Sequence, residues 1–502
     1  MRLEHSLALR HGLVEDSDID CGVPTTKRVD ASPGVIGNQR IQLTEEDNAR
    51  IKRKTDKAVL TVLVWIYFLQ VLDKAVLGIG SLFSLQEDTS MHGNQYSWVG
   101  SISPIAQLAW QPFSTWLIVR VPHRILLPTL VLGWGISQAC MAGCRDFASL
   151  LAGRFFLGLF EAGCLPLFSV ITSQWYRRAE QPIRVAIWYS TNGAATITAS
   201  VLAYGLGHIP SAILKPWQII FLFTGLVTIV SSLWAYWKLD NNISSARFLT
   251  ESERQQAIER LRANQIGTGS REFKWSHVLE AALEPKSYLW IVMSVLVNIG
   301  ASVASVFGPL VLSSFGFDKF RSSLWNIPFG AVQAIVILAS CWAAHQAKLK
   351  SMILAAFMIP VIVGAAMLYM LDRDPSDRAP LLIAYYLLAC LFSGNPLIVS
   401  WIIGNTAGTT KQSVNMALYQ AGSSVGNIVG PLLFHEKDAP IYHPGLRVVL
   451  GVFIAMIVSS MRKTYHSRMS GKDAIDDAGM LLGQQAFLDL TDQQNDEFVY
   501  IY

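Results

Sequence analysis

Long apolar stretches with almost no charge recur along the whole chain, separated by short polar segments. Each stretch is roughly 17–25 residues long, which is the length a helix needs to cross a bilayer. In hydrocarbon every backbone N–H and C=O must be satisfied within the protein, so these segments are either helices or strands of a closed barrel. Barrel strands would be about half as long and would alternate strictly, which these stretches do not. The pattern predicts an all-α polytopic membrane protein.

The apolar pattern predicts twelve transmembrane helices in two sets of six. The first set is expected at 59–84, 97–119, 125–143, 147–172, 183–207 and 217–237. The second set is expected at 287–312, 323–344, 350–371, 380–404, 413–434 and 445–461. The last of these is the shortest and the least apolar.

A polar segment between the sixth and seventh spans is predicted to be helical. Thr250 and Glu253 form a capping box that opens an amphipathic helix over 251–264, and a second short helix is expected over 276–283. Six spans, a linker and six more spans indicate two pseudo-symmetric six-helix bundles with a substrate site between them near mid-bilayer. The predicted parts are a mostly disordered tail (1–58), a bundle (59–238), a linker (239–286), a bundle (287–461) and a second tail (462–502).

Basic residues gather on one predicted side of the membrane. Lys and Arg cluster at 52–57, 120–124, 177–184, 348–350 and 462–468, which all fall on the side of the N-terminus. The first loop on the opposite side, between the first and second spans, contains neither Lys nor Arg. Because cytoplasmic loops carry the excess of positive charge, both termini are predicted to be cytoplasmic.

Composition agrees with a membrane protein and argues against several other classes. The chain is 52% hydrophobic and 15% charged, against about 25% charged in globular domains. Its net charge of +4 is too small to indicate binding to nucleic acid. It lacks a G-x-x-x-x-G-K-[ST] phosphate loop, an H-E-x-x-H motif and a Cys/His cluster. We therefore expect neither an ATP-driven pump nor an enzyme, with no catalytic residues, no metal site and no cofactor.

Charges inside the predicted spans are candidates for function, because each costs at least about 2.5 kcal/mol to insert. Asp73 and Lys74 lie near the middle of the first span. Arg154 and Glu161 are seven residues apart on the fourth span, about two turns, so they share one face of the helix. An alternative is that Asp73 forms a buried structural ion pair with Lys74 or Arg154.

Uncharged polar and aromatic side chains near mid-membrane are secondary candidates for contact with the substrate: Asn192, Asn298, Gln333, Asn395, Gln420, Trp188 and Tyr189. Each polar group could bind substrate or could join helices to one another, which is the commoner role. Glycines spaced four apart on the eleventh span are predicted to form a close helix-packing ridge: Gly422, Gly426 and Gly430.

Several ordered motifs resemble one family. They are Leu72-Asp73-Lys74, Gln95–Ser101, Arg154–Gly163, Trp175-Tyr176, Glu180–Ser190, Phe248–Glu251, Lys411–Val414, Gly426–Pro431, Asp438–Pro440 and Ala486–Asp492. Together they are similar to the major facilitator superfamily and, within it, to the fungal anion:cation symporter group that includes allantoate permeases. The resemblance implies a multi-pass, monomeric transporter of the fungal plasma membrane that imports small organic anions together with protons.

The resemblance also gives roles to the buried charges, because it implies that the first and fourth helices border the central cavity. Lys74 is then expected to bind the anionic group of the substrate. Glu161 is expected to carry the coupling proton, with Arg154 and Asp73 in the same proton-coupling group.

The chain departs from the family pattern at positions that would line the pocket. Gly78 and Ile79 stand where Asn and Tyr are usual, and Gln111 and Gln333 stand where Glu is common. The substrate is therefore expected to be a carboxylate such as allantoate, ureidosuccinate or nicotinate, without a choice among them. The alternatives are an exporter of a fungal secondary metabolite and a nutrient sensor that does not transport.

Overall fold

The computed structural model describes residues 44–82, 85–92, 95–177, 180–207, 209, 213–262, 273–314, 319–347, 350–371, 377–432, 451, 454–455 and 491–494. All described residues belong to one compact unit, 41–502. The predicted disordered tail before residue 44 and nearly all of the twelfth span lie outside the described residues.

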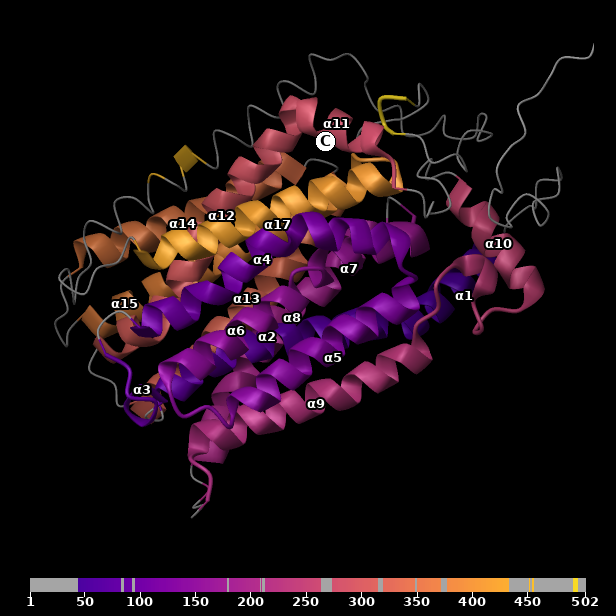
Figure 1. The fold of residues 1–502 in the computed structure, drawn as a ribbon. Coiled ribbons are helices and arrows are strands. Elements are labelled where there is room, and N and C mark those ends of the chain that lie inside the picture. The colour runs from indigo at the N-terminus through magenta and orange to yellow at the C-terminus, as the bar shows by residue number, and fades with distance from the viewer. Residues whose placement is uncertain are drawn as a thin grey trace, which may run out of the picture. The chain divides into compact units, whose positions relative to one another are not determined.

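The first half of the described chain is a succession of helices (Figure 1). They are α1 (Glu45–Thr55), the π-helical turn η1 (Asp56–Leu60), α2 (Thr61–Leu82), α3 (Leu85–Asp88), α4 (Gln95–Arg120), α5 (His123–Met141), α6 (Phe147–Glu161), α7 (Cys164–Trp175), α8 (Gln181–Gly207) and α9 (Pro216–Lys238). Side chains cap two of their starts: Thr44 accepts from the backbone N–H of Asp47, and Asp146 from that of Ser149.

The second half begins after the linker helices. The linker holds the 3₁₀ turn η2 (Ile243–Ser245), α10 (Glu251–Arg262) and α11 (Trp275–Leu283). The helices that follow are α12 (Pro285–Ser314), α13 (Lys319–Ala347), α14 (Lys350–Met370), α15 (Arg378–Leu387), the 3₁₀ segment η4 (Leu388–Ser393), α16 (Gly394–Gly404) and α17 (Thr409–Leu432). Within the described residues, each of the first eleven predicted spans is helical over most of its length.

Seven helical segments of the described chain are individually long and apolar enough to cross a bilayer. All the regular structure described is helical. These two observations confirm the predicted all-α polytopic membrane protein.

Two predicted spans are interrupted, and each interruption has a proline just after it. The fourth span is divided at Ala162 and Gly163, because Pro166 has no N–H to donate to the carbonyl of Ala162. The side-chain amide of Gln111 donates to that carbonyl instead, at 3.1 Å. The tenth span passes through η4 just before Pro396, which likewise leaves a carbonyl four residues earlier without its usual donor.

Two extensive helix contacts join the first half of the chain to the second, beside smaller contacts of α8 with α16 and of α7 with α16 and α17. In Figure 1, α4 runs beside α17, and α8 contacts α13. The α8–α13 crossing is close because Gly330 meets Gly193: a Cβ built on Gly330 would lie 2.8 Å from the Gly193 carbonyl oxygen. The uncharged candidates on α8, α13 and α17 therefore lie on helices that take part in these two contacts.

The predicted glycine ridge lies against α12. A Cβ on Gly422, Gly426 or Gly430 would come within 2.8, 2.7 and 2.8 Å of backbone oxygens of α12. Because backbone cannot move aside as a flexible side chain can, larger residues at these positions would separate α12 from α17.

Candidate functional site

The structure brings Lys74 and Glu161 together. The Lys74 ammonium on α2 lies 3.5 Å from Glu161 Oε2, at the last residue of α6. The Lys74 side chain is 47% exposed, whereas that of Glu161 is fully buried. The same Glu161 oxygen accepts a hydrogen bond of 2.9 Å from the amide of Gln107 on α4. Lys74 is therefore an exposed cation held beside a buried acid.

Asp73 is buried beside this pair but is bound differently. Its Oδ2 accepts a hydrogen bond of 2.6 Å from the indole N–H of Trp134 on α5 and one of 3.2 Å from the hydroxyl of Thr228 on α9. Neither Lys74 nor Arg154 lies within ion-pair distance of it. The alternative of a structural ion pair at Asp73 is therefore wrong. Asp73 joins three helices of the first half instead.

Arg154 is buried on α6 without an ion pair among the described residues. Its Nε and Nη1 have no hydrogen-bond partner in the part of the chain that the structure describes. A buried guanidinium is costly unless it is paired. Its positive field reaches Glu161, Asp73 and Tyr96, so it acts on the acids of this cluster from a distance.

The polar candidates of the second half form a separate cluster. Asn395 Oδ1 on α16 accepts from the Tyr419 hydroxyl on α17 at 2.5 Å and from the Asn298 amide on α12 at 3.4 Å. Asn298 also donates to the carbonyl of Ser294, at 2.8 Å. Asn298 and Asn395 thus join helices of the second half.

Aromatic side chains of α2 and α8 form a buried group. Trp188 and Tyr189 stack at 4.4 Å between ring centroids, and Tyr67 meets both rings edge-on at 5.0 and 5.1 Å. The Asn192 amide donates to the Tyr67 hydroxyl at 3.1 Å. Tyr189 and Tyr419 are close enough to interact electrostatically, so this group meets the polar cluster of the second half.

Two glutamines take part in hydrogen bonds between the two halves of the chain. Gln333 on α13 accepts from Thr196 on α8 at 3.4 Å. Gln420 on α17 donates to Gln107 Oε1 on α4, also at 3.4 Å. Both bonds lie along the α8–α13 and α4–α17 contacts.

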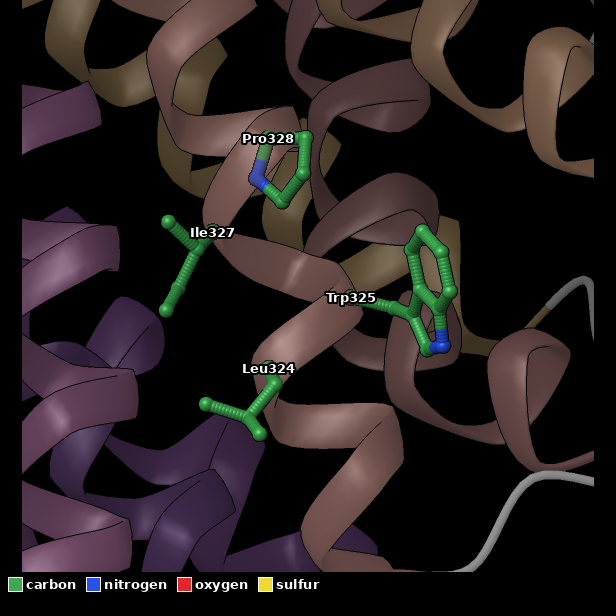
Figure 2. A pocket seen from close by; sticks show the side chains of 4 residues that line it. All are labelled: Leu324, Trp325, Ile327 and Pro328. Atoms are coloured by element: carbon green, nitrogen blue, oxygen red, sulfur yellow. The ribbon is translucent and has the colours of Figure 1, made fainter.

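A shallow apolar hollow lies elsewhere, on α13. Figure 2 shows Leu324, Trp325, Ile327 and Pro328 around it. These side chains offer almost no polar surface, and none of the candidate residues lines the hollow. We therefore place the candidate site at the charged cluster.

Sequence reasoning missed Gln107 and Trp134. Gln107 could have been found, because it is an uncharged polar residue within a predicted span, as Gln333 and Gln420 are. Trp134 gave no such signal, since an indole in an apolar helix looks like any other packing residue until its N–H is seen to reach Asp73.

A second buried ionic cluster surrounds Lys411 at the start of α17. Its ammonium lies 2.7 Å from Glu280, 2.7 Å from Glu284 and 2.8 Å from Asp492. Lys286 also contacts Glu284 and Asp492. The three carboxylates lie close enough together to suggest a metal site, but the Lys411 ammonium already supplies a cation at their centre.

Residues 63–431 match the Major Facilitator Superfamily. The chain belongs to this superfamily. It is 30% identical to the thiamine pathway transporter THI73 of Saccharomyces cerevisiae, over 91% of this chain and 87% of that protein. It is 28% identical to the allantoate permease of the same yeast, over 84% of this chain and 79% of that protein. The chain is thus a multi-pass secondary transporter of a small molecule, as its motifs predicted.

Solved structures agree with this superfamily fold. The proton:xylose symporter XylE aligns with a TM-score of 0.61 at 12% identity, over 84% of this chain and 96% of that one. The human organic anion transporter MFSD10 aligns with a TM-score of 0.58 at 14% identity, over 81% of this chain and 99% of that one. At such low identity the likeness concerns the fold alone.

Proposed function

We propose that the transporter imports a small organic anion together with a proton. The observation that carries the proposal is the Lys74–Glu161 pair, in which an exposed cation and a buried acid lie 3.5 Å apart. In this proposal Lys74 binds the anionic group of the substrate, and Glu161 carries the proton. Asp73 and Arg154 shape the electric field around both.

The exposure of Lys74 supports its role as the anion site. A charge in mid-span that faced lipid would cost at least about 2.5 kcal/mol, so exposed charges there normally face a water-filled cavity. The partner of Lys74, Glu161, is hydrogen-bonded to Gln107, which in turn reaches the second half of the chain. In this proposal Lys74 faces the cavity between the halves, where this fold would hold its substrate.

The burial of Glu161 supports its role in proton coupling. A carboxylate out of water is stabilised mainly by its cationic neighbour, so an anion that draws Lys74 away makes protonation of Glu161 more favourable. Substrate binding and proton binding would therefore favour each other. This is the thermodynamic requirement for symport.

The polar and aromatic candidates would complete the pocket from both halves. We propose that Asn192, Trp188 and Tyr189 contact substrate from α8, facing Asn298 and Asn395 across the pocket. Gln333 and Gln420 would contribute from α13 and α17. The electrostatic interaction between Tyr189 and Tyr419 supports this, because these residues belong to the aromatic group of the first half and the polar cluster of the second.

Alternating access also needs a contact between the halves that can break. The Ser173 hydroxyl on α7 donates to the Gln412 amide oxygen on α17 at 2.8 Å, and both side chains are buried. The charge distribution predicts that these helix ends are cytoplasmic, with both termini on the same side. We propose that this contact closes the cytoplasmic entrance, and that the transporter works as a monomer in the plasma membrane.

The proposal is tested by uptake into yeast that lacks its related permeases. The panel contains allantoate, ureidosuccinate, nicotinate and thiamine, each radiolabelled and offered at external pH 5 and pH 7, with and without a protonophore. Thiamine is included because a relative is named for its pathway and because its positive charge makes it the opposite of the expected substrate.

The expected result is uptake of a carboxylate that is faster at pH 5 and collapses with the protonophore. Lys74→Ala should abolish it, and Glu161→Gln should remove its dependence on pH. Uptake of thiamine by the wild type that is unchanged in Lys74→Ala would contradict the anion site. Energy-dependent efflux of the anions, without uptake, would favour an exporter instead.

A further inference from the structure

A side chain outside the predicted site connects the proposed proton carrier to the opposite half of the chain. Gln107 is buried on α4, where its Nε2 donates to Glu161 at 2.9 Å. Its Oε1 accepts from the amide of Gln420 on α17 at 3.4 Å. Lys74, Glu161, Gln107 and Gln420 therefore form a continuous polar chain that starts at an exposed cation and ends on α17.

The Gln107 amide has a donor, its NH₂, at one side and an acceptor, its oxygen, at the other. This difference fixes the direction of the hydrogen bonds along the polar chain. An ionised carboxylate offers only acceptors, so Gln107 must turn its NH₂ toward Glu161. Its carbonyl then faces Gln420, which must present its own NH₂. The structure has this arrangement, and it leaves Gln420 Oε1 buried without a partner among the described residues.

Protonation of Glu161 reverses the orientation that the Gln107 amide must adopt. The other carboxylate oxygen, Oε1, is buried and has no hydrogen-bond partner in the described chain. A proton placed on that oxygen would have no acceptor there, which is costly for a buried donor. A proton on Oε2 can be donated to Gln107 only if the Gln107 amide rotates and presents its carbonyl.

Rotation of Gln107 then acts on Gln420. The turned amide presents its NH₂ to α17, where it meets the NH₂ of Gln420, and two donors cannot bond to each other. Gln420 must either rotate to present its unpartnered oxygen or lose the bond. In both cases the hydrogen bonding across the α4–α17 contact depends on the proton at Glu161.

We infer that Gln107 is a positioning residue that transmits the protonation state of Glu161 to the α4–α17 contact. The inference rests on the proposed role of Glu161 as proton carrier. Other groups also act on Glu161: Lys74 and Asp73 from α2, Arg154 from its own helix and the Cys164 thiol from α7. In the described part of the chain none of these four residues hydrogen-bonds to Gln420. Of the residues that act on Glu161, Gln107 is therefore the one that connects it to α17.

Methionine substitutions test the inference, because methionine keeps the length of glutamine and removes its amide. Gln107→Met breaks both bonds, and Gln420→Met breaks only the bond across the contact. Gln181→Met is the matched control: Gln181 on α8 is also a buried glutamine whose amide donates to a backbone carbonyl, that of Tyr176, and it has no part in the proposed site. The probe is radiolabelled allantoate, replaced by ureidosuccinate or nicotinate if the wild type takes up only that anion.

The measurement is the ratio of initial uptake rates at pH 5 and pH 7, normalised to protein at the cell surface. Exchange of labelled for unlabelled probe is measured in the same cells. We expect Gln107→Met and Gln420→Met to lower this ratio from severalfold toward unity while exchange continues. Gln181→Met should keep the wild-type ratio. If one of the two variants does not reach the surface, the other still tests the inference, since each removes a different part of the hydrogen-bonded path from Glu161 to α17.

A wild-type ratio in either surface-expressed variant, Gln107→Met or Gln420→Met, would overturn the inference. Glu161→Gln, measured in parallel, separates this outcome from failure of the proposed function. If Glu161→Gln loses the pH dependence and Gln107→Met keeps it, Glu161 carries the proton without this relay. If Glu161→Gln itself keeps the pH dependence, the proposed proton carrier is wrong.

Discussion

Replacing Lys411 by methionine should destabilise the transporter strongly. The Lys411 side chain is fully buried, and its ammonium touches three carboxylates at 2.7–2.8 Å. Burial disfavours the charged form of Asp492, but Lys286 and Lys411 outweigh it and hold the pKa of Asp492 below its ordinary value. Its carboxylate is therefore ionised at neutral pH, and the Lys411→Met variant would leave this negative charge with less compensation.

The size of the effect follows from the geometry. Removing one partner of a buried ion pair costs about 3–5 kcal/mol. We expect the lower end, about 3 kcal/mol, because Lys286 still neutralises part of the cluster. For a cooperative unit of about 150–250 residues each kcal/mol lowers Tm by about 2–4 °C, so the predicted fall is roughly 6–12 °C.

The assay is thermal unfolding of the purified transporter in detergent at pH 7. Lys215→Met is the matched control, because Lys215 pairs with Asp88 but its side chain is 56% exposed, and such pairs contribute about 1 kcal/mol or less. Adding Glu284→Gln to Lys411→Met should recover part of the loss by removing one uncompensated charge. The reasoning is refuted if Lys411→Met melts no lower than Lys215→Met.

Three further predictions concern other contacts. Gly426→Leu should prevent α12 from approaching α17, and the variant should lose folded protein at the cell surface, whereas Gly426→Ala should lose less; equal surface levels for both would contradict this. Trp134→Phe removes the indole donor from buried Asp73, so we expect a loss of about 1–3 kcal/mol in detergent unfolding; an unchanged midpoint would show that the bond is dispensable. The hydrogen bond from Lys54 lowers the pKa of Glu253 to about 2 from 4.5, so its contribution is present above pH 4.5 and lost as the pH falls toward 2. The difference in Tm between wild type and Glu253→Gln should shrink over that range, and a constant difference would contradict the assignment.

The spans were predictable because the bilayer imposes a length and an apolar composition that can be read from single segments. Their interruptions depend on partners distant in sequence. Pro166 marks a missing donor to the Ala162 carbonyl, but only the structure shows that Gln111 on another helix supplies it. Without that partner, a continuous helix over 147–172 was a reasonable expectation.

The charged candidates were predictable for the same energetic reason, since a charge in a span is costly and therefore conspicuous. The pairing of these charges was not predictable. Sequence allowed Asp73 to pair with Lys74, yet neighbouring residues on a helix point about 100° apart, and Lys74 instead meets Glu161. Gln107 shows what the sequence alone cannot predict. The role of an uncharged amide depends on its hydrogen-bond partners, here Glu161 and Gln420, which only the structure identifies.

The most direct test of symport is proton movement driven by substrate in proteoliposomes. A pH-sensitive dye is trapped inside, and the transported anion is added outside with no initial pH gradient or membrane potential. We predict that the lumen acidifies as the anion enters and that Glu161→Gln abolishes acidification while anion exchange continues. Anion entry without acidification by the wild type, or equal acidification by Glu161→Gln, would contradict the proposed coupling.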